Sequence, residues 1–233
     1  MLSTRPAQFA AHLRQLRDGG ATVLSLHDGV ERLRRGDLPQ RAVAITFDDG
    51  FRSVLEHALP LLSQYRFPAT VFVVSGYVGA TNDWPSQPAM LARQPLLDWS
   101  EIVELADAGI EIGAHSHTHA HLPGLSRAAI EEEILGSRQR IEDHIGRSVR
   151  AFAYPYGEYD RDVIAAASAH VSIACSTDLG IAVPTSDPMA LERLDTYYLR
   201  PLWAVRALFS GPMRAYIAMR RLAREVRARA ARS

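Results

Sequence analysis

The sequence predicts an α/β fold in which a mostly parallel β-sheet is covered by helices on both faces. Short continuous apolar runs alternate with amphipathic segments along most of the 233 residues, and this alternation is typical of βαβ units. Six or seven such repeats favour a barrel over an open sheet. The length suits a single α/β domain, and 47% apolar with 22% charged residues is the composition of a globular protein with a large core.

The strands are predicted from short apolar runs that end at polar or turn-forming residues. In chain order these runs are 21–26, 42–47, 69–74, 110–114, 151–154 and 171–175. We expect the runs at 42–47 and 69–74 to be buried. Residues 75–98, which are rich in Gly, Pro, Asn and Trp, are expected to form a long loop.

The helices are predicted from apolar side chains spaced three or four residues apart and from start and stop signals. The first carries Phe9, Leu13 and Leu16 and stops at Gly19-Gly20. The others are 28–36, 53–65, 100–109, 126–145 and 160–169. Ser100 is the expected cap of the helix at 100–109.

All 26 basic residues are arginine, and the chain contains no lysine. This composition excludes a Schiff-base lysine, a lysine nucleophile and a lysine-containing phosphate loop. The formal net charge of zero hides an asymmetry, because residues 200–233 hold nine arginines and one acid, whereas residues 1–199 hold 17 arginines and 25 acids. A basic tail on an acidic body suggests that the tail meets an anionic partner.

Cys175 is the only cysteine, which excludes an intrachain disulfide. Its place in the run VSIACST favours a buried small apolar side chain over a nucleophile. The N-terminal segment lacks the apolar region of a signal peptide, and no uncharged apolar run reaches about 18 residues. We therefore predict a cytoplasmic protein with no signal peptide or transmembrane segment, which is peripheral at the membrane if its tail binds lipid.

Two adjacent carboxylates, Asp48 and Asp49, follow the run at 42–47 in the segment TFDDG. Active-site residues of parallel α/β folds gather past the C-terminal ends of the strands. Because neighbouring side chains at a strand end diverge, one carboxylate can bind a metal while the other faces a substrate. The alternative is an Asp-Gly turn in which both carboxylates only cap the next helix.

Four of the nine histidines follow the run at 110–114, in the segment HSHTHAH. His115 and His119 are four residues apart, and in a helical turn their imidazoles share a face and can hold a divalent metal. His117 and His121 then point elsewhere, and we expect them to be neighbouring or surface groups. A lone histidine is more often a core or surface residue, but a cluster after a strand favours metal binding.

The third candidate segment is AFAYPYG, in which a strand stops at a proline between two tyrosines. Pro155 fixes φ and lacks an N–H, so the N–H of Tyr156 can face a pocket. We expect Tyr154 and Pro155 to contact substrate, and the alternative is a simple turn with aromatic packing. Together the three segments supply two imidazoles and a carboxylate for a metal, a spare carboxylate and an oxyanion donor, which suits metal-assisted hydrolysis.

The segments TFDDG, HSHTH and FAYPYG, in this order, resemble the motifs of the polysaccharide deacetylase family, also called the NodB homology domain or carbohydrate esterase family four. The resemblance covers roughly residues 9–200. It implies a distorted (β/α) barrel with about seven parallel strands, a divalent metal usually taken to be zinc, and hydrolysis of an N-acetyl or, less often, an O-acetyl group on a sugar. We expect a catalytic domain at 1–200 and a basic helical tail at 201–233.

The same resemblance implies a role for each matching residue. Asp48 matches the general base, and Asp49, His115 and His119 match the metal ligands. Tyr156 matches the residue whose backbone N–H helps to hold the oxyanion. These roles agree with the chemistry, since a metal polarises an amide carbonyl and makes water more acidic, and a carboxylate can remove the proton from that water.

Two features of the family pattern are missing. Many members have an arginine two residues before the motif proline, where this chain has Ala153, and Arg150 and Arg193 are the candidates to replace it. The late histidine motif of the family is also absent, so the general acid is unassigned. Either Asp48 recycles the proton, or a distant group such as His27 of the early LHD segment reaches the site.

Residues 213–230 contain no proline or glycine, and at about 100° per residue one side of this predicted helix is apolar. That side consists of Tyr216, Met219, Leu222, Ala223, Val226 and Ala230, and the rest holds arginines 214, 220, 221, 224, 227 and 229 with Met213 and Ile217. One interpretation packs the apolar side on the barrel. The other places it on an anionic membrane or a lipid-linked glycan, with Trp203, Leu208 and Phe209 as anchors. No motif favours nucleic acid.

The leading functional hypothesis is a metal-dependent N-deacetylase that acts on an acetylated amino sugar in a polysaccharide, an oligosaccharide or a lipid-linked glycan. One alternative changes the acyl group, as in a deformylase or another C–N amide hydrolase. A second alternative is a non-catalytic carbohydrate-binding protein of the same fold, which the missing arginine and late histidine motivate.

Overall fold

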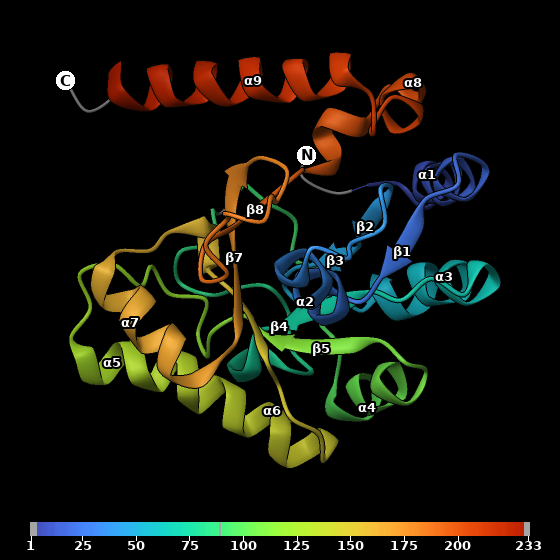
Figure 1. Ribbon diagram of the computed structural model, residues 1–233. Helices are drawn as coiled ribbons and strands as arrows, with labels where there is room; N and C mark the ends of the chain where they lie inside the picture. The colour runs from blue at the N-terminus through green and yellow to red at the C-terminus, as the bar shows by residue number, and fades with distance from the viewer. Residues whose placement is uncertain (1–3, 89, 231–233) are drawn as a thin grey trace.

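The computed structural model describes residues 4–88 and 90–230, and its architecture is α/β (Figure 1). Six parallel strands in the sequential order β3-β4-β5-β6-β7-β8 form a sheet that curls into a half-barrel, and β1 and β2 form a separate parallel pair. The strands are β1 (Thr22–Leu24), β2 (Ala42–Ala44), β3 (Thr46–Phe47), β4 (Thr70–Val73), β5 (Glu111–Ala114), β6 (Ala151–Ala153), β7 (Ile173–Leu179) and β8 (Leu191–Arg193). The predicted barrel-like class is confirmed.

Helices connect β1 to β2 and each successive pair of strands from β3 to β7, whereas in the part of the chain that the structure describes no helix lies between β2 and β3 or between β7 and β8 (Figure 1). The helices are α1 (Pro6–Asp18), α2 (Leu26–Arg35), α3 (Leu59–Tyr65), α4 (Trp99–Asp107), α5 (Arg127–Glu131), α6 (Ser137–Ile145), α7 (Arg161–His170), α8 (Leu202–Arg206) and α9 (Gly211–Ala230). The predicted stop at Gly36 is confirmed, since this glycine caps α2 with a φ of 77°.

The run at 42–47 is not the single buried strand that we predicted. Its first half, β2, pairs with β1, and its second half, β3, pairs with β4, so the chain changes sheets at Ile45. The residues of both halves are half-buried or exposed. In contrast, the prediction for 69–74 is confirmed, because all four residues of β4 are buried.

The predicted cap of α4 is also wrong. Asp98 caps this helix, since its carboxylate accepts from the Glu101 N–H at 2.9 Å and the Glu101 carboxylate accepts from the Asp98 N–H at 2.8 Å. This reciprocal pair is a capping box. Ser100 lies inside the first turn, where its hydroxyl donates to Asp98 at 2.6 Å.

Two predicted helices contain a π-helical turn. The helix predicted at 53–65 begins with the turn Val54–Ala58, and the helix predicted at 126–145 is divided by the turn Glu132–Gly136. Pro60 follows the first turn and lacks the N–H that an α-helical bond requires there. The second turn contains Glu133, a residue of the candidate site described below.

The core fills the space between the sheet and its helices. Val71, Ile112 and Phe152, from three neighbouring strands, are at most 5% exposed. Gly113 of β5 is necessary here, because a Cβ atom at this position would lie 2.5 Å from the Phe72 ring. Cys175 is fully buried, as predicted, and burial raises the pKa of its thiol to about 12.

The tail packs on the half-barrel by a side of α9 that we did not predict. Met213 and Ile217 are 1% and 4% exposed and cluster with Leu179 and Ala204, whereas the predicted apolar side is largely exposed. The side chains of Arg227, Arg229 and Ala230 lie outside the described part of the chain. Within that part, no helix has the length and apolarity needed to cross a membrane. The cytoplasmic location and the domain boundary at residue 200 stay predictions.

Candidate metal centre and active site

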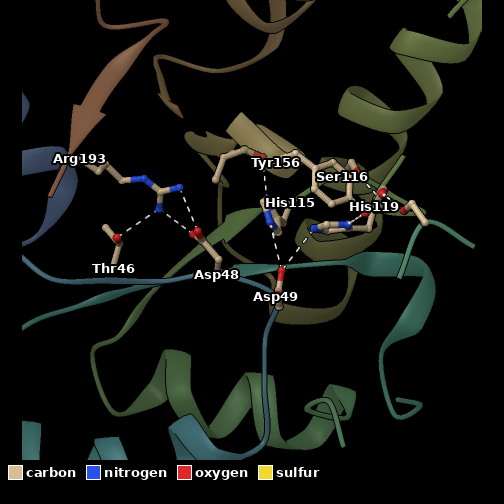
Figure 2. Close-up of polar contacts among 10 residues, drawn as sticks. Thr46, Asp48, Asp49, His115, Ser116, His119, Tyr156 and Arg193 are labelled. Carbon is tan, nitrogen blue, oxygen red and sulfur yellow. Dashed lines mark hydrogen bonds and ion pairs between the residues drawn. The ribbon is translucent and has the colours of Figure 1, made fainter. Parts of the chain in front are cut away.

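The candidate residues meet at the C-terminal edge of the main sheet. Asp48 and Asp49 directly follow β3, His115 follows β5, Tyr156 lies three residues after β6, and Arg193 is the last residue of β8. Parallel strands bring their C-terminal ends to one edge of a sheet. Figure 2 shows the side chains pointing toward one another across this edge.

Asp49, His115 and His119 form a group that can hold a metal ion. Their ligand atoms all lie within 4.8 Å of one another, and Asp49 Oδ1 is 3.3 Å from His115 Nε2 and 3.4 Å from His119 Nε2. Zinc ligands at about 2.1 Å around a tetrahedral centre are separated by about 3.4 Å. The donor set and its spacing therefore fit a divalent cation such as zinc.

The outer nitrogens of both imidazoles have hydrogen-bond partners. His115 Nδ1 lies 2.7 Å from the Ala153 carbonyl oxygen, which can only accept, so this nitrogen carries the proton. In the neutral ring Nε2 then presents its lone pair toward Asp49. His119 Nδ1 lies 2.9 Å from the Tyr156 hydroxyl, and Trp84 stacks on the same imidazole at 4.2 Å. Such outer contacts fix the ring orientation of metal-ligating histidines.

The two histidines converge through a strained loop and not through the helical turn that we predicted. Residues 115–120 contain bends and no helix, and Ser116 and His119 have φ values of 63° and 57°. The Ser116 hydroxyl accepts from the His119 N–H at 2.9 Å and closes the turn. His119 thereby returns to the side of the loop on which His115 lies.

Unfavourable backbone conformations concentrate in this site. The non-glycine residues with positive φ in the described chain are Asp49, Arg66, Ser116, His119 and Tyr156. All of these except Arg66 belong to the candidate site. Such conformations cost roughly 1–3 kcal/mol each and persist only where the surroundings enforce them. The clustering is typical of a functional site.

Glu133 holds the histidine loop, residues 115–120, in place through hydrogen bonds. One carboxylate oxygen accepts from the N–H groups of His117 and Thr118, both at 2.8 Å, and the other accepts from the Thr118 hydroxyl at 2.6 Å. Glu133 is only 8% exposed. The sequence prediction missed this residue, because its contacts arise from tertiary structure.

Arg193 pairs with the second carboxylate. Its guanidinium donates to both oxygens of Asp48, at 2.7 and 2.9 Å, and lies 3.4 Å from the Thr46 hydroxyl (Figure 2). A bidentate pair of this kind fixes the orientation of a carboxylate. Of the two candidates to replace the arginine missing at Ala153, Arg193 is the one that contacts Asp48. The other candidate, Arg150, lies 3.2 Å from His27 instead.

The surroundings keep both aspartates ionised. Burial opposes ionisation of Asp48, but the adjacent Arg193 charge outweighs it and holds the pKa below its ordinary value. Burial also opposes ionisation of Asp49, but the adjacent imidazoles of His115 and His119 outweigh it and hold the pKa below its ordinary value. At neutral pH one carboxylate can thus ligate a cation while the other accepts a proton.

Of the three residues that follow β6, Tyr156 lies in the candidate site, whereas Tyr154 and Pro155 are buried in the core. Tyr156 has a φ of 60°, and its hydroxyl contacts Ser86 and His119, so the residue is fixed beside the candidate ligands. Tyr154 is fully buried and donates to the Met189 carbonyl at 2.8 Å, and Pro155 is buried as well. These positions argue against the substrate contacts predicted for Tyr154 and Pro155.

The remaining histidines are not ligands in this arrangement. His117 Nδ1 lies 3.0 Å from the Ser75 hydroxyl, and His121 Nδ1 lies 2.7 Å from Glu158, as expected of neighbouring groups. The His27 N–H lies 3.4 Å from the carboxylate of Glu111, which begins β5. His27 is therefore at the opposite end of the strand that leads to His115, so it cannot serve as the general acid.

Comparison with known proteins agrees with this fold. Residues 35–171 match the family described as Polysaccharide deacetylase, and the chain belongs to this family. A relative in Staphylococcus aureus, named poly-beta-1,6-N-acetyl-D-glucosamine N-deacetylase, is 27% identical over 169 residues. The match covers 69% of this chain and 56% of the relative, so the chain spans little more than half the length of that protein.

Solved structures show the same fold. IcaB from Ammonifex degensii superposes with a TM-score of 0.75 at 25% identity, covering 89% of this chain and 93% of IcaB. The deacetylase PplD from Streptococcus pyogenes, solved in complex with acetate, gives a TM-score of 0.73 at 24% identity and covers 83% of this chain and 82% of PplD. The likeness to PplD supports the fold alone.

Proposed function

We propose that this protein is a metal-dependent N-deacetylase that removes acetyl groups from amino sugars in a polysaccharide. The observation that carries the proposal is the convergence of Asp49, His115 and His119 beside an arginine-paired Asp48, at the strand ends of a polysaccharide deacetylase fold. The name of the S. aureus relative supports an N-acetylated amino sugar as the substrate.

Asp49, His115 and His119 would hold the cation, and their two nitrogen atoms and one oxygen atom suit zinc. When bound, a divalent cation supplies Lewis acidity toward a carbonyl oxygen and lowers the pKa of water. The hydrogen bond that His115 donates to the Ala153 carbonyl, and the one between His119 and the Tyr156 hydroxyl, keep the two imidazoles aimed at that position. The two imidazoles are therefore oriented for metal binding before the substrate binds.

Asp48 is the proposed general base. Its carboxylate takes a proton from water as the water oxygen forms a bond to the acetyl carbonyl carbon. Cleavage of the C–N bond then releases acetate, and the departing nitrogen needs a proton. Asp48 can return the proton that it took, which balances the reaction as amide plus water giving amine plus acetic acid. This recycling accounts for catalysis without a separate general acid.

The Tyr156 N–H is the proposed oxyanion donor. The left-handed conformation of Tyr156 and the contacts of its hydroxyl fix this residue next to His119. A fixed N–H that points at the developing oxyanion needs no reorganisation during the reaction. Backbone donors of this kind typically contribute about a hundredfold or more in rate.

Arg193 weakens the case for a non-catalytic protein. That hypothesis rests on the missing late histidine and on the missing arginine at Ala153, and the bidentate contact of Arg193 with Asp48 supplies the charge of that arginine. A deformylase keeps the same machinery and differs only in the acyl pocket. The experiment below separates these functions by their products.

The proposal is tested by measuring acetate released from an N-acetylglucosamine oligomer by the zinc-loaded protein. The wild type is expected to release acetate, and Asp48→Asn is expected to lower the rate at least about a hundredfold while retaining bound zinc, because Asp49 and both histidines are intact. Faster release of formate from an N-formylated oligomer would favour a deformylase. Release of neither acetate nor formate, or full activity of Asp48→Asn, would contradict the proposed mechanism.

A further inference from the structure

The outer side of α9 is apolar and uncovered. Met219, Leu222 and Val226 are 59%, 61% and 57% exposed. At about 100° per residue they lie roughly opposite Met213 and Ile217, which pack on the half-barrel. Figure 1 shows α9 running along the edge of the molecule above β7 and β8. The helix thus presents one apolar side to the body and a second one outward.

Arginines on the inner side hold α9 in this orientation. The Arg220 guanidinium lies 5.3 Å from the centre of the Tyr198 ring, and Arg224 donates to the Thr177 carbonyl at 3.3 Å. Charged side chains ordinarily face water while apolar ones face the protein. Here Met219, Leu222 and Val226 face outward although two arginines contact the body, so burial within this fold does not account for these three apolar side chains.

The charge of the tail restricts which kind of partner can bind the outer side of α9. Residues 200–233 carry nine arginines and a single glutamate. A second copy of the chain would bring two such excesses of positive charge together, which disfavours association. A polyanion without apolar groups would leave the three side chains in water. An anionic lipid bilayer matches both the charge and the apolar surface.

An exposed aromatic residue agrees with a bilayer surface. Trp203 of α8 is 59% exposed, and tryptophan is favoured at membrane interfaces, where its ring is partly apolar and its N–H stays hydrated. The other predicted anchors, Leu208 and Phe209, are half-buried, and Arg41 lies over the Phe209 ring at 5.9 Å. The candidate anchors are therefore Trp203 and the outer side of α9.

We propose that the outer side of α9, formed by Met219, Leu222 and Val226, docks on an anionic lipid bilayer with the help of the tail arginines. The (β/α) body is then held at the membrane surface without any membrane-spanning segment in the described chain. The proposal concerns lipid binding alone, so it does not depend on the deacetylase function.

The test is co-sedimentation of the full chain with vesicles of phosphatidylglycerol and phosphatidylcholine, and with vesicles of phosphatidylcholine alone. The wild type is expected to bind the anionic vesicles at least about tenfold more strongly. The triple variant Met219→Ser, Leu222→Ser, Val226→Ser is expected to lose at least about tenfold of that binding. Serine leaves the net charge unchanged, and the buried Met213 and Ile217 remain to hold α9 in place.

A matched control replaces exposed apolar residues elsewhere. Ile181 and Val183 are 40% and 47% exposed in the segment between β7 and β8, and their serine variants are expected to bind vesicles like the wild type. Circular dichroism confirms that every variant is folded. Equal binding to both vesicle types, no binding, or unchanged binding of the triple variant would overturn the proposal. A dimer in sedimentation that the triple variant dissociates would assign the surface to a second copy and would overturn it too.

Discussion

Asp48 and Arg193 are 145 residues apart in the chain, yet their side chains form the bidentate ion pair of the candidate site. A carboxylate held by two parallel hydrogen bonds has few orientations available. A general base gains from this restriction, because it must meet a water molecule and the reacting carbonyl in one geometry. We therefore propose that Arg193 is a positioning residue, which acts through Asp48.

We predict that Arg193→Met lowers kcat for acetate release by about tenfold to a hundredfold, because Asp48 loses its orientation. KM and bound zinc are expected to change little, since Arg193 contacts none of the candidate metal ligands and has no proposed contact with the substrate. Arg193→Lys is expected to recover part of the rate through its charge. Steady-state kinetics and metal analysis provide the measurements.

The matched control is Arg150→Met, which removes the other arginine that the sequence offered. Arg150 contacts His27 at the opposite end of β5 from His115, so its loss is expected to leave kcat within about twofold. Equal effects of the two substitutions would show that the pairing of Arg193 with Asp48 has no special role.

Individual residues of the site differed in how far they could be predicted. Asp48, Asp49, His115 and His119 lie in short segments directly after recognisable strands, so their types and spacing carried the prediction. Arg193 could not be selected over Arg150, because a three-residue strand such as β8 has too weak a pattern to place its last residue at the sheet edge.

At the scale of secondary-structure elements, the loop after β5 and the π-helical turn Glu132–Gly136 act together. Glu133 in the turn accepts three hydrogen bonds from the loop that carries His115 and His119. This buried contact offsets the cost of the left-handed residues in the loop. The geometry of the candidate metal centre therefore depends on an element that supplies none of the candidate ligands.

We predict that Glu133→Ala weakens zinc binding by about tenfold to a hundredfold, because the loop loses its anchor while both histidines remain. Competition with a chromogenic chelator measures this affinity. Glu132→Ala is the neighbouring control, since Glu132 pairs with Arg140 on the surface and its loss is expected to leave zinc affinity unchanged. Unchanged affinity in Glu133→Ala would mean that the loop holds its shape alone.

The differences between prediction and structure at this scale have a common physical origin. The spacing of apolar residues predicted the order of strands and helices. The split of residues 42–47 into β2 and β3 depends instead on tertiary structure, because β2 pairs with β1 and β3 pairs with β4. The helical turn expected at His115 is replaced by two left-handed residues, a cost that tertiary contacts impose and local propensity does not reveal.

At the scale of the whole molecule, the formal net charge of zero is the sum of an acidic body, residues 1–199, and a basic tail, residues 200–233. The tail is not an independent appendage, because Met213 and Ile217 complete a buried cluster with Leu179 of β7. The helical period of α9 was predicted, but its packed side was not, since both sides carry apolar residues and a single chain's pattern does not say which one meets the body.

We propose that Asp49, His115 and His119 hold the divalent cation on which deacetylation depends. The most direct measurement follows acetate release after removal of metal by a chelator and its restoration with zinc. We predict that the wild type binds about one zinc ion and recovers at least about a hundredfold in rate. His115→Ala is expected to recover neither, whereas the exposed His57→Ala recovers both. Full activity of the metal-depleted wild type, or stoichiometric zinc in an active His115→Ala, would contradict the claim.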